Sequence, residues 1–198
     1  MSARNAPDVA GHAWPDLPDN CHACLIYDNP AQRDAVVRAY LETGLRQGQA
    51  VRYFTDETPE DVVRSWLPED VLPEASDKVR IAAAVSVYCP DGEFDPHRMV
   101  EGMIPKYELA RKAGFTGLRS AGEMTWALRG LPGSDRLLEY EALLNTLESD
   151  FPHLGMCQYD ARRFDGATLF HVLRIHPYVV AGDRVVWNPY FDADQRAS

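Results

Sequence analysis

The residues best suited to chemistry in this sequence stand directly after apolar runs that we predict to be strands. Aromatic and acidic side chains gather at these points, which are Tyr27-Asp28, Thr55-Asp56, Tyr88-Cys89, Glu123 through Trp126 and Tyr159-Asp160. In an open parallel sheet, ligands bind at the carboxyl ends of the strands. We therefore expect an aromatic-lined pocket with a few polar groups, which is the usual makeup of a small-molecule site. The alternative is that polar residues collect there without a function, because the chain enters loops.

The predicted ligand-binding residues are Tyr27, Asp28, Tyr88, Glu123, Trp126, Tyr159, Asp160 and His22. The four aromatic side chains would form the walls of the pocket. Glu123, Asp160 or His22 would orient the ligand, since a buried polar group of a ligand must find a hydrogen-bond partner. Positive charge is scarce at these positions, so the expected ligand is a neutral or weakly polar organic molecule.

Histidine and cysteine residues offer a second kind of site. His22, Cys24, Cys157 and either His171 or His176 could together bind a metal ion. The segment Cys21-His22-Ala23-Cys24 contains one C-x-x-C without a second pair, which is a weak zinc signal. Buried thiols explain these cysteines equally well. We therefore expect no metal, and keep a metal- or redox-responsive sensor that uses His22, Cys24 and Cys157 as the alternative.

Glu141 and Asn145 are four residues apart on a predicted helix, beside an apolar stripe of leucines. Side chains at this spacing lie on the same face, so both can contact one partner. A solvated helix edge is the alternative.

Residues 22–56 read as a strand, a tight turn, an amphipathic helix and a second strand, which is how nucleotide-binding α/β domains open. A phosphate-binding loop there needs the pattern G-x-x-x-x-G-K-[ST]. The turn from Tyr27 to Arg33 has no glycine, and the chain has only three lysines, Lys78, Lys106 and Lys112. The patterns G-x-S-x-G, H-E-x-x-H and G-x-G-x-x-G are also absent. We therefore expect neither an enzyme nor a cofactor.

Composition narrows the class further. With 198 residues, 45% hydrophobic and 25% charged, the chain fits one ordinary globular domain. The net charge of −10 argues against direct binding of nucleic acid, which requires a basic surface. There is no apolar run near 18 residues and no apolar core of a signal peptide, so we expect a cytoplasmic protein that does not enter a membrane.

Alternating strand and helix patterns predict an α/β fold: a three-layer sandwich with a mostly parallel central sheet and helices on both faces. Beyond residue 56, we expect helices at 59–67 (capped by Thr58), 94–113 (kinked at Pro105), 134–150 (capped by Ser134) and 167–173. The further strands are expected at 78–89, 118–126 and 156–159, with a terminal hairpin of 178–180 and 184–187. Residues 1–19 are expected to be flexible, residues 20–192 to form the domain, and residues 193–198 to form a tail.

Several spaced blocks of the sequence are similar to those of one known family. They are His22-x-Cys24, Gly44-Leu45-x-x-Gly48, the run from Gly114 to Trp126 (GFTGLRSAGEMTW), Tyr140-Glu141 with Asn145, Cys157-Gln158-Tyr159-Asp160 and His176-Pro177. In this order they resemble the MEDS domain, the sensory domain of methanogens, methylotrophs and DcmR-type regulators. The resemblance covers residues 20 to 190.

This resemblance implies a degenerate RecA/KaiC-like domain without a working phosphate loop. It also implies a cytoplasmic sensor that binds a small hydrocarbon-derived or one-carbon-type molecule and signals to a histidine kinase or a transcription regulator. The chain would be either free-standing or part of a longer protein, and a homodimer is compatible with this role. A protein-interaction module without a ligand is a further alternative.

Overall fold

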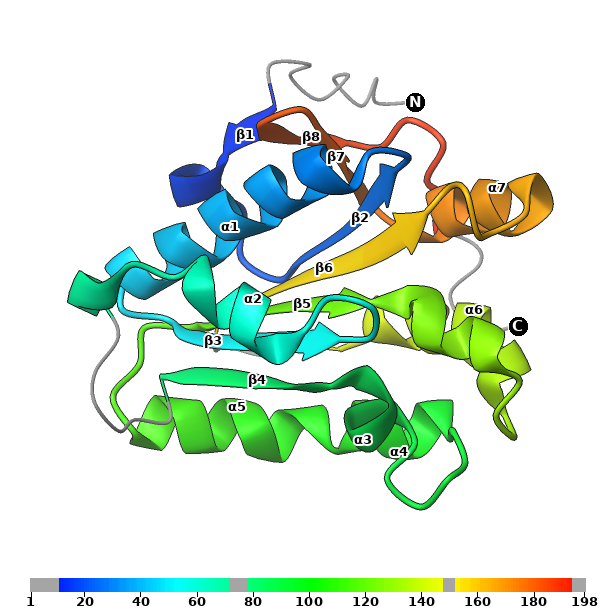
Figure 1. The fold of residues 1–198 in the computed structure, drawn as a ribbon, viewed down its shortest axis with the longest axis horizontal. Coiled ribbons are helices and arrows are strands. Elements are labelled where there is room, and N and C mark those ends of the chain that lie inside the picture. The colour runs from blue at the N-terminus through cyan, green and yellow to red at the C-terminus, as the bar shows by residue number, and fades with distance from the viewer. Residues whose placement is uncertain (1–10, 72–77, 148–151, 194–198) are drawn as a thin grey trace, which may run out of the picture.

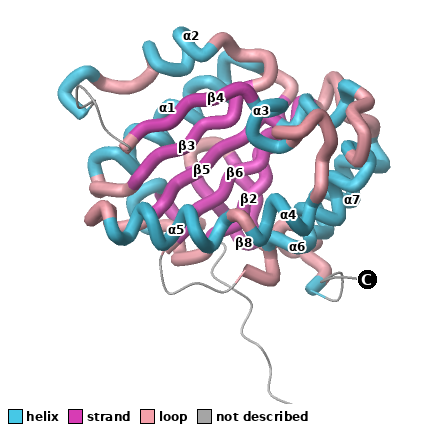
Figure 2. The backbone as a smooth tube through the Cα atoms, turned by 90° about the horizontal axis from the view of Figure 1, so that it is seen from below, coloured by secondary structure: helices cyan, strands magenta, loops and turns pink. Residues whose placement is uncertain are grey.

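The protein is built around an eight-stranded, mostly parallel sheet (Figure 1). The computed structural model describes residues 11–71, 78–147 and 152–193. The strands are β1 (His12–Ala13), β2 (Cys21–Tyr27), β3 (Ala50–Thr55), β4 (Val79–Ala83), β5 (Leu118–Glu123), β6 (His153–Asp160), β7 (Tyr178–Ala181) and β8 (Arg184–Trp187). Their order across the sheet is β1-β8-β7-β2-β6-β5-β3-β4, which can be followed from β8 to β4 in Figure 2. Only β1–β8 and β7–β8 pair antiparallel in the described sheet, so the predicted α/β class and the terminal hairpin are confirmed.

Helices cover both faces of this sheet. On one face lie α1 (Pro30–Arg46) and α2 (Glu60–Ser65), whose Val37, Leu41 and Val63 share a core with Ala23 and Met156 of the strands. The other face carries α3 (Ala84–Tyr88), α4 (Pro96–Glu101), α5 (Met103–Lys112), α6 (Leu137–Leu144) and α7 (Gly166–Ile175). The result is the predicted three-layer arrangement.

The opening unit β2–α1–β3 has the predicted form. The side chain of Asn29 caps α1, because its Oδ1 accepts hydrogen bonds from the backbone N–H of Ala31 (3.0 Å) and Gln32 (3.4 Å). Pro30 occupies the first helical position, where a missing N–H costs nothing. Gly48, with φ of +78°, turns the chain from the helix into β3.

The predicted strand at 78–89 is wrong in its second half. β4 ends at Ala83, and the chain continues as the short helix α3 from Ala84 to Tyr88. The run Ala82-Ala83-Ala84 has a strong helical preference, and an apolar run alone does not distinguish a buried strand from a buried helix. Tyr88 therefore stands at the end of a helix and not of a strand.

The predicted helix at 94–113 is two helices, and the break differs from the expected one. α4 ends at Glu101 and α5 begins at Met103, so the break falls at Gly102 and Pro105 lies in the first turn of α5. Proline cannot bond the carbonyl four residues earlier, which is that of Glu101, so the break lies on the N-terminal side of Pro105. Asp95 caps α4 by accepting hydrogen bonds from the N–H of His97 (3.0 Å) and Arg98 (3.1 Å).

Three further boundaries differ from the predictions. β5 ends at Glu123 and a 3-10 helix, Met124–Arg129, follows it. The predicted helix from Ser134 opens as a 3-10 turn, with α6 starting at Leu137, and residues 148–150 lie outside the described residues. Thr58 does not cap α2, because its hydroxyl accepts a hydrogen bond from an arginine of α1.

The segment before β2 differs from the expected flexible lead-in where the structure describes it. His12–Ala13 pairs with β8, and Trp14 is buried against Tyr40 with ring centroids 5.8 Å apart. Residues 1–10 of that lead-in, and residues 194–198 of the predicted tail, lie outside the described residues.

Candidate functional site

The eight predicted ligand-binding residues do not converge on one pocket. Tyr27, Asp28, Glu123 and Asp160 lie at the carboxyl edge of the sheet, Tyr88 and Trp126 lie in an aromatic core, and His22 and Tyr159 belong to a buried polar cluster. Alternation along the strands explains part of this separation, because neighbouring residues of a strand point to opposite faces. Tyr159 thus faces α6 while Asp160 faces away from it.

The carboxyl edge on the α1 side is closed by an internal ionic network. Arg33 of α1 donates a hydrogen bond to Oε1 of Glu123 over 2.8 Å, and the hydroxyl of Tyr53 donates to the same oxygen over 2.8 Å. Oε2 of Glu123 accepts from the backbone N–H of Asp56 (2.8 Å) and Glu57 (2.6 Å), which follow β3. Burial raises the pKa of Glu123, but these hydrogen bonds and the Arg33 charge outweigh it, and the pKa is lowered.

This network lies at the first turn of α1, directly after the turn in which the sequence lacks the phosphate-loop pattern. The guanidinium of Arg33 points inward and also donates to Thr58 Oγ1 over 2.9 Å. Tyr27 covers it, with its ring centroid 5.3 Å from Cζ of Arg33, while Asp28 is exposed and Asp160 pairs with Arg162 over 2.6 Å. The buried charges of Arg33 and Glu123 at this edge are thus paired within the protein.

Tyr88 and Trp126 stack at 4.8 Å between ring centroids, with 11° between their planes. Phe94 packs on the edge of Trp126 at 4.8 Å, and Phe54 and Tyr140 each lie 5.8 Å from Tyr88. Trp126 has no exposed surface. These rings fill the space between β5 and the helices, so they form a packed core and not the open walls that we expected.

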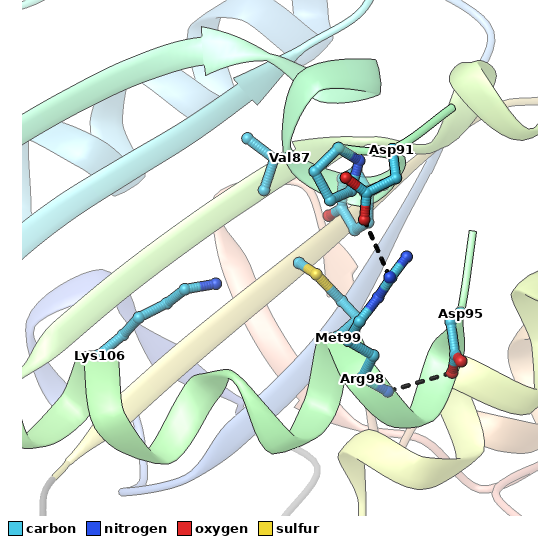
Figure 3. A pocket seen from close by; sticks show the side chains of 8 residues that line it. Val87, Asp91, Asp95, Arg98, Met99 and Lys106 are labelled. Carbon is cyan, nitrogen blue, oxygen red and sulfur yellow. Dashed lines mark hydrogen bonds and ion pairs between the residues drawn. The ribbon is translucent and has the colours of Figure 1, made fainter. Parts of the chain in front are cut away.

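A pocket of about 170 Å³ opens beside this core (Figure 3). It is lined by Val87, Tyr88, Pro90, Asp91, Asp95, Arg98, Met99 and Lys106, from α3, α4, α5 and the loop between α3 and α4. Val87 and Met99 give it apolar surface. Arg98 pairs with Asp91 over 3.0 Å at one side, and Lys106 extends along the other (Figure 3). Of the predicted residues, Tyr88 alone contributes to this lining.

The third environment is a polar cluster buried between β2, β6, α6 and α7. Its centre is Glu141 of α6, which has no exposed surface. Oε2 of Glu141 lies 3.0 Å from His22 Nε2, 3.3 Å from His176 Nε2 and 3.3 Å from Cys157 Sγ. The hydroxyl of Tyr159 donates to the other oxygen, Oε1, over 2.5 Å.

The outer nitrogens of the two imidazoles are held by fixed partners. Asn145 donates its amide N–H to the carbonyl of Ile175 over 2.8 Å, so its Oδ1 faces His22 Nδ1 at 2.9 Å and accepts the Nδ1–H. His176 Nδ1 donates to the carbonyl of Val172 over 2.8 Å. With Nδ1–H held in this way, each Nε2 faces Glu141, and it donates to the carboxylate when the ring is protonated and offers a lone pair when the ring is neutral.

Burial acts on the charge state of this cluster. Burial and the neighbouring His22 lower the pKa of His176, which favours a neutral ring. Burial and the Glu141 charge raise the pKa of the Cys157 thiol well above its usual range. For Glu141, burial raises the pKa, but the positive charge and the hydrogen bonds of the two histidines, which require a proton on Nε2, lower it by more.

The cluster contains part of the alternative metal site that the sequence indicated. His22, Cys157 and His176 do meet, and Glu141 takes the place expected for Cys24. Cys24 Sγ lies 3.8 Å from the carbonyl oxygen of Tyr178, and His171 is exposed on α7. The spacing of Glu141 and Asn145 was the signal that could have identified them, since both contact His22.

A family model matches most of this chain. The family of methanogen/methylotroph, DcmR sensory domains matches residues 21–177. This chain belongs to the MEDS family. The matched residues include the pocket and the whole buried polar cluster, so both are parts of the MEDS domain.

Known proteins similar to this MEDS domain agree with a regulatory role. The transcriptional repressor DcmR of Methylorubrum extorquens is 27% identical over 178 residues, which are 88% of this chain and 64% of the repressor. A sensory domain family and a repressor relative together support a sensing or regulatory role.

A solved structure shares the fold of the MEDS domain. The flagellar accessory protein FlaH of Methanocaldococcus jannaschii matches with a TM-score of 0.54 and 12% identity, over 92% of this chain and 83% of that chain. This likeness shows that the two chains share a fold. In the described part of the MEDS domain, no helix has the length and apolar character needed to cross a bilayer.

Proposed function

We propose that this MEDS domain is the sensory part of a cytoplasmic regulator, and that it binds a small organic molecule in the pocket beside Tyr88. The observation that carries the proposal is this pocket, which lies within the matched sensory domain and against a rigid aromatic core. Half of its lining residues are apolar or aromatic and half are charged, and a concave site that combines apolar walls with polar groups is the usual form of a small-molecule site.

The size and lining of the pocket favour a short ligand. About 170 Å³ holds a molecule of a few heavy atoms, since one water molecule takes about 30 Å³ in the liquid. Val87, Tyr88 and Met99 would contact its hydrocarbon part. Arg98 and Lys106 would contact one polar group, so the ligand class is a hydrocarbon derivative with a single polar end.

The signal would pass from α4 to α6. Arg98 and Met99 of the pocket belong to α4, which packs against α6. His97 of α4 also contacts Glu139 of α6, with 3.1 Å between Nε2 and Oε1. A ligand that favours one position of α4 would thereby bias the surface of α6.

The partner that reads this surface would be a signalling or transcription protein. DNA contact by the domain itself is disfavoured by the net charge of −10.

A thermal-shift screen of short hydrocarbon derivatives, each with one alcohol, amine or carboxylate group, tests the proposal. A ligand that binds the folded state must raise the melting temperature. Val87→Trp would fill the pocket and abolish the shift. Val62→Trp is the matched control, because Val62 is 38% exposed on the opposite face.

Two results would contradict this proposal. The first is that no compound stabilises the protein, which favours a ligand-free interaction module. The second is an equal loss of the shift in both variants, which would place the site elsewhere.

A further inference from the structure

We infer that His22, Glu141, Cys157 and His176 form a four-ligand site for one divalent transition-metal ion of the zinc class. This site is separate from the proposed ligand pocket, since none of its four residues lines that pocket. The proposal rests on the distances, the direction of the lone pairs and the charge balance of the cluster.

The distances between the donor atoms suit a tetrahedral ion. All four donor atoms lie within 4.8 Å of one another. Four of the separations are 3.0 Å (His22 to Glu141), 3.3 Å (His176 to Glu141), 3.3 Å (Cys157 to Glu141) and 3.6 Å (Cys157 to His22). Bonds of about 2.0 Å to nitrogen and oxygen and 2.3 Å to sulfur give tetrahedral edges of about 3.3 to 3.6 Å.

The lone pairs of the cluster converge on its centre. Because Asn145 and the Val172 carbonyl hold the two Nδ1–H groups, both Nε2 atoms face the Glu141 carboxylate, and loss of the Nε2 proton leaves each with a lone pair directed at the centre of the cluster. His176 Nε2 is buried and lies 3.3 Å from Glu141 Oε2, but the geometry of this contact is not that of a hydrogen bond. A neutral Nε2 beside a carboxylate needs a cation between the two atoms, and a metal ion supplies it where the ring has lost its Nε2 proton.

The charges of the cluster balance around a dication. Two neutral imidazoles, one carboxylate and one thiolate carry a net charge of −2, so a divalent ion makes the buried site neutral. Binding would form a metal–sulfur bond and release the Cys157 thiol proton to the solvent. Two nitrogens, one sulfur and one oxygen in a closed set favour zinc over magnesium or calcium, which prefer oxygen ligands.

The surroundings of the donors match those of known metal sites. Metal-binding histidines donate their other N–H to a carbonyl, an amide or a carboxylate, which orients the ring. Asn145 and the Val172 carbonyl do this here, and Tyr159 donates to the free oxygen of Glu141. The ion would join β2, β6, α6 and the end of α7.

The first test is metal binding by the whole 198-residue chain after treatment with a chelator. We expect one zinc ion per chain and a higher melting temperature with zinc. Cobalt(II) should bind with the absorption band of a cobalt–thiolate bond. A chain that binds no stoichiometric zinc, or cobalt without this band, overturns the proposal.

The second test separates the donor set from its neighbours. Cys157→Ser should remove the cobalt–thiolate band, whereas Cys24→Ser, at an equally buried cysteine on the adjacent strand, should keep it. The reverse pattern would overturn the proposed ligands.

The third test uses the carboxylate. Glu141→Gln keeps the shape of the side chain and should lower the zinc affinity by more than about 100-fold. Loss of a group that only hydrogen-bonds to a ligand costs up to about 100-fold, and loss of a ligand itself should cost more. Glu139→Gln, two residues away and partly exposed, should leave the affinity unchanged. If both cluster variants fail to fold, the zinc content and cobalt spectrum of the unaltered protein decide the question.

Discussion

Arg33 and Glu123 form a buried ion pair at the carboxyl edge of the sheet, with 2.8 Å between Nη1 and Oε1 and side chains that are 7% and 2% exposed. The pair joins the first turn of α1 to the end of β5. The protein therefore neutralises this edge with its own charges. The absence of enzymatic activity remains a prediction, and titration with ATP and magnesium tests it directly.

Glu123→Gln should destabilise the protein by about 3 kcal/mol, because it leaves the Arg33 charge buried without its main partner. Glu57→Gln is a suitable control, since Glu57 is half-exposed and its pair with Arg163 lies at the surface. We expect the control to change the free energy of unfolding by less than about 0.5 kcal/mol. Urea unfolding measures both variants, and equal values would refute a stabilising role for the buried pair.

The same carboxylate predicts an acid limit of stability. The pKa of Glu123 in the folded protein lies below its ordinary value of 4.5, so the folded state binds fewer protons than the unfolded state in this range. The contribution of Glu123 to the free energy of unfolding is complete above pH 4.5. It is lost as the pH falls through the pKa that Glu123 has in the folded protein. Melting temperatures between pH 7 and pH 3 should therefore fall less steeply in Glu123→Gln than in the unaltered protein. Parallel curves would contradict this assignment.

The sequence was sufficient to predict β2–α1–β3 and the terminal hairpin, because these elements carry local signals. Asn29 and Pro30 mark the start of a helix, and Gly182, with φ of +64°, marks the hairpin turn. α3 was missed because the apolar run before Tyr88 fits a buried helix as well as a strand. The helix breaks at Gly102 and not at Pro105, because a proline disrupts the hydrogen bond to the carbonyl four residues earlier.

The candidate sites were harder to predict than the elements. Residues at strand ends were expected to share one pocket, but the two faces of the sheet separate Tyr159 from Asp160. The meeting of Glu141 with His22 depends on how α6 packs against β2 and β6, which no local pattern specifies. The sequence left open whether His171 or His176 joins the metal-binding residues. The packing of α7 decides this, because it buries His176 and leaves His171 exposed.

Gly133 is expected to be essential for the loop that supports the aromatic core. Its φ is +78°, and a Cβ added there would overlap the carbonyl oxygen of Phe94. Gly133→Ala should therefore cost roughly 3 kcal/mol or more, from the unfavourable φ and the clash together. Gly130→Ala is the matched control, because its φ is +70° and a Cβ there meets nothing within 4 Å. The control should lose only about 1 to 2 kcal/mol, and urea unfolding that shows equal losses would refute the clash.

Asn145 is predicted to position His22 for the inferred metal ion. Asn145→Ala removes the acceptor of the Nδ1–H of His22, and the freed ring can rotate or change its tautomer. Zinc affinity should fall about 10- to 100-fold, while the cobalt–thiolate band from Cys157 persists at saturating metal.

Thr146→Ala is the control for Asn145→Ala, since Thr146 is exposed and bonds only the carbonyl of Leu143 nearby. Competition with a zinc-binding dye measures both affinities. A purely structural role for Asn145 would lower the melting temperature of the metal-free protein and leave the zinc affinity unchanged. A positioning role requires a lower zinc affinity together with a retained cobalt band. The four ligands are all still present in this variant, but the ring of His22 is no longer held in the orientation that the metal needs.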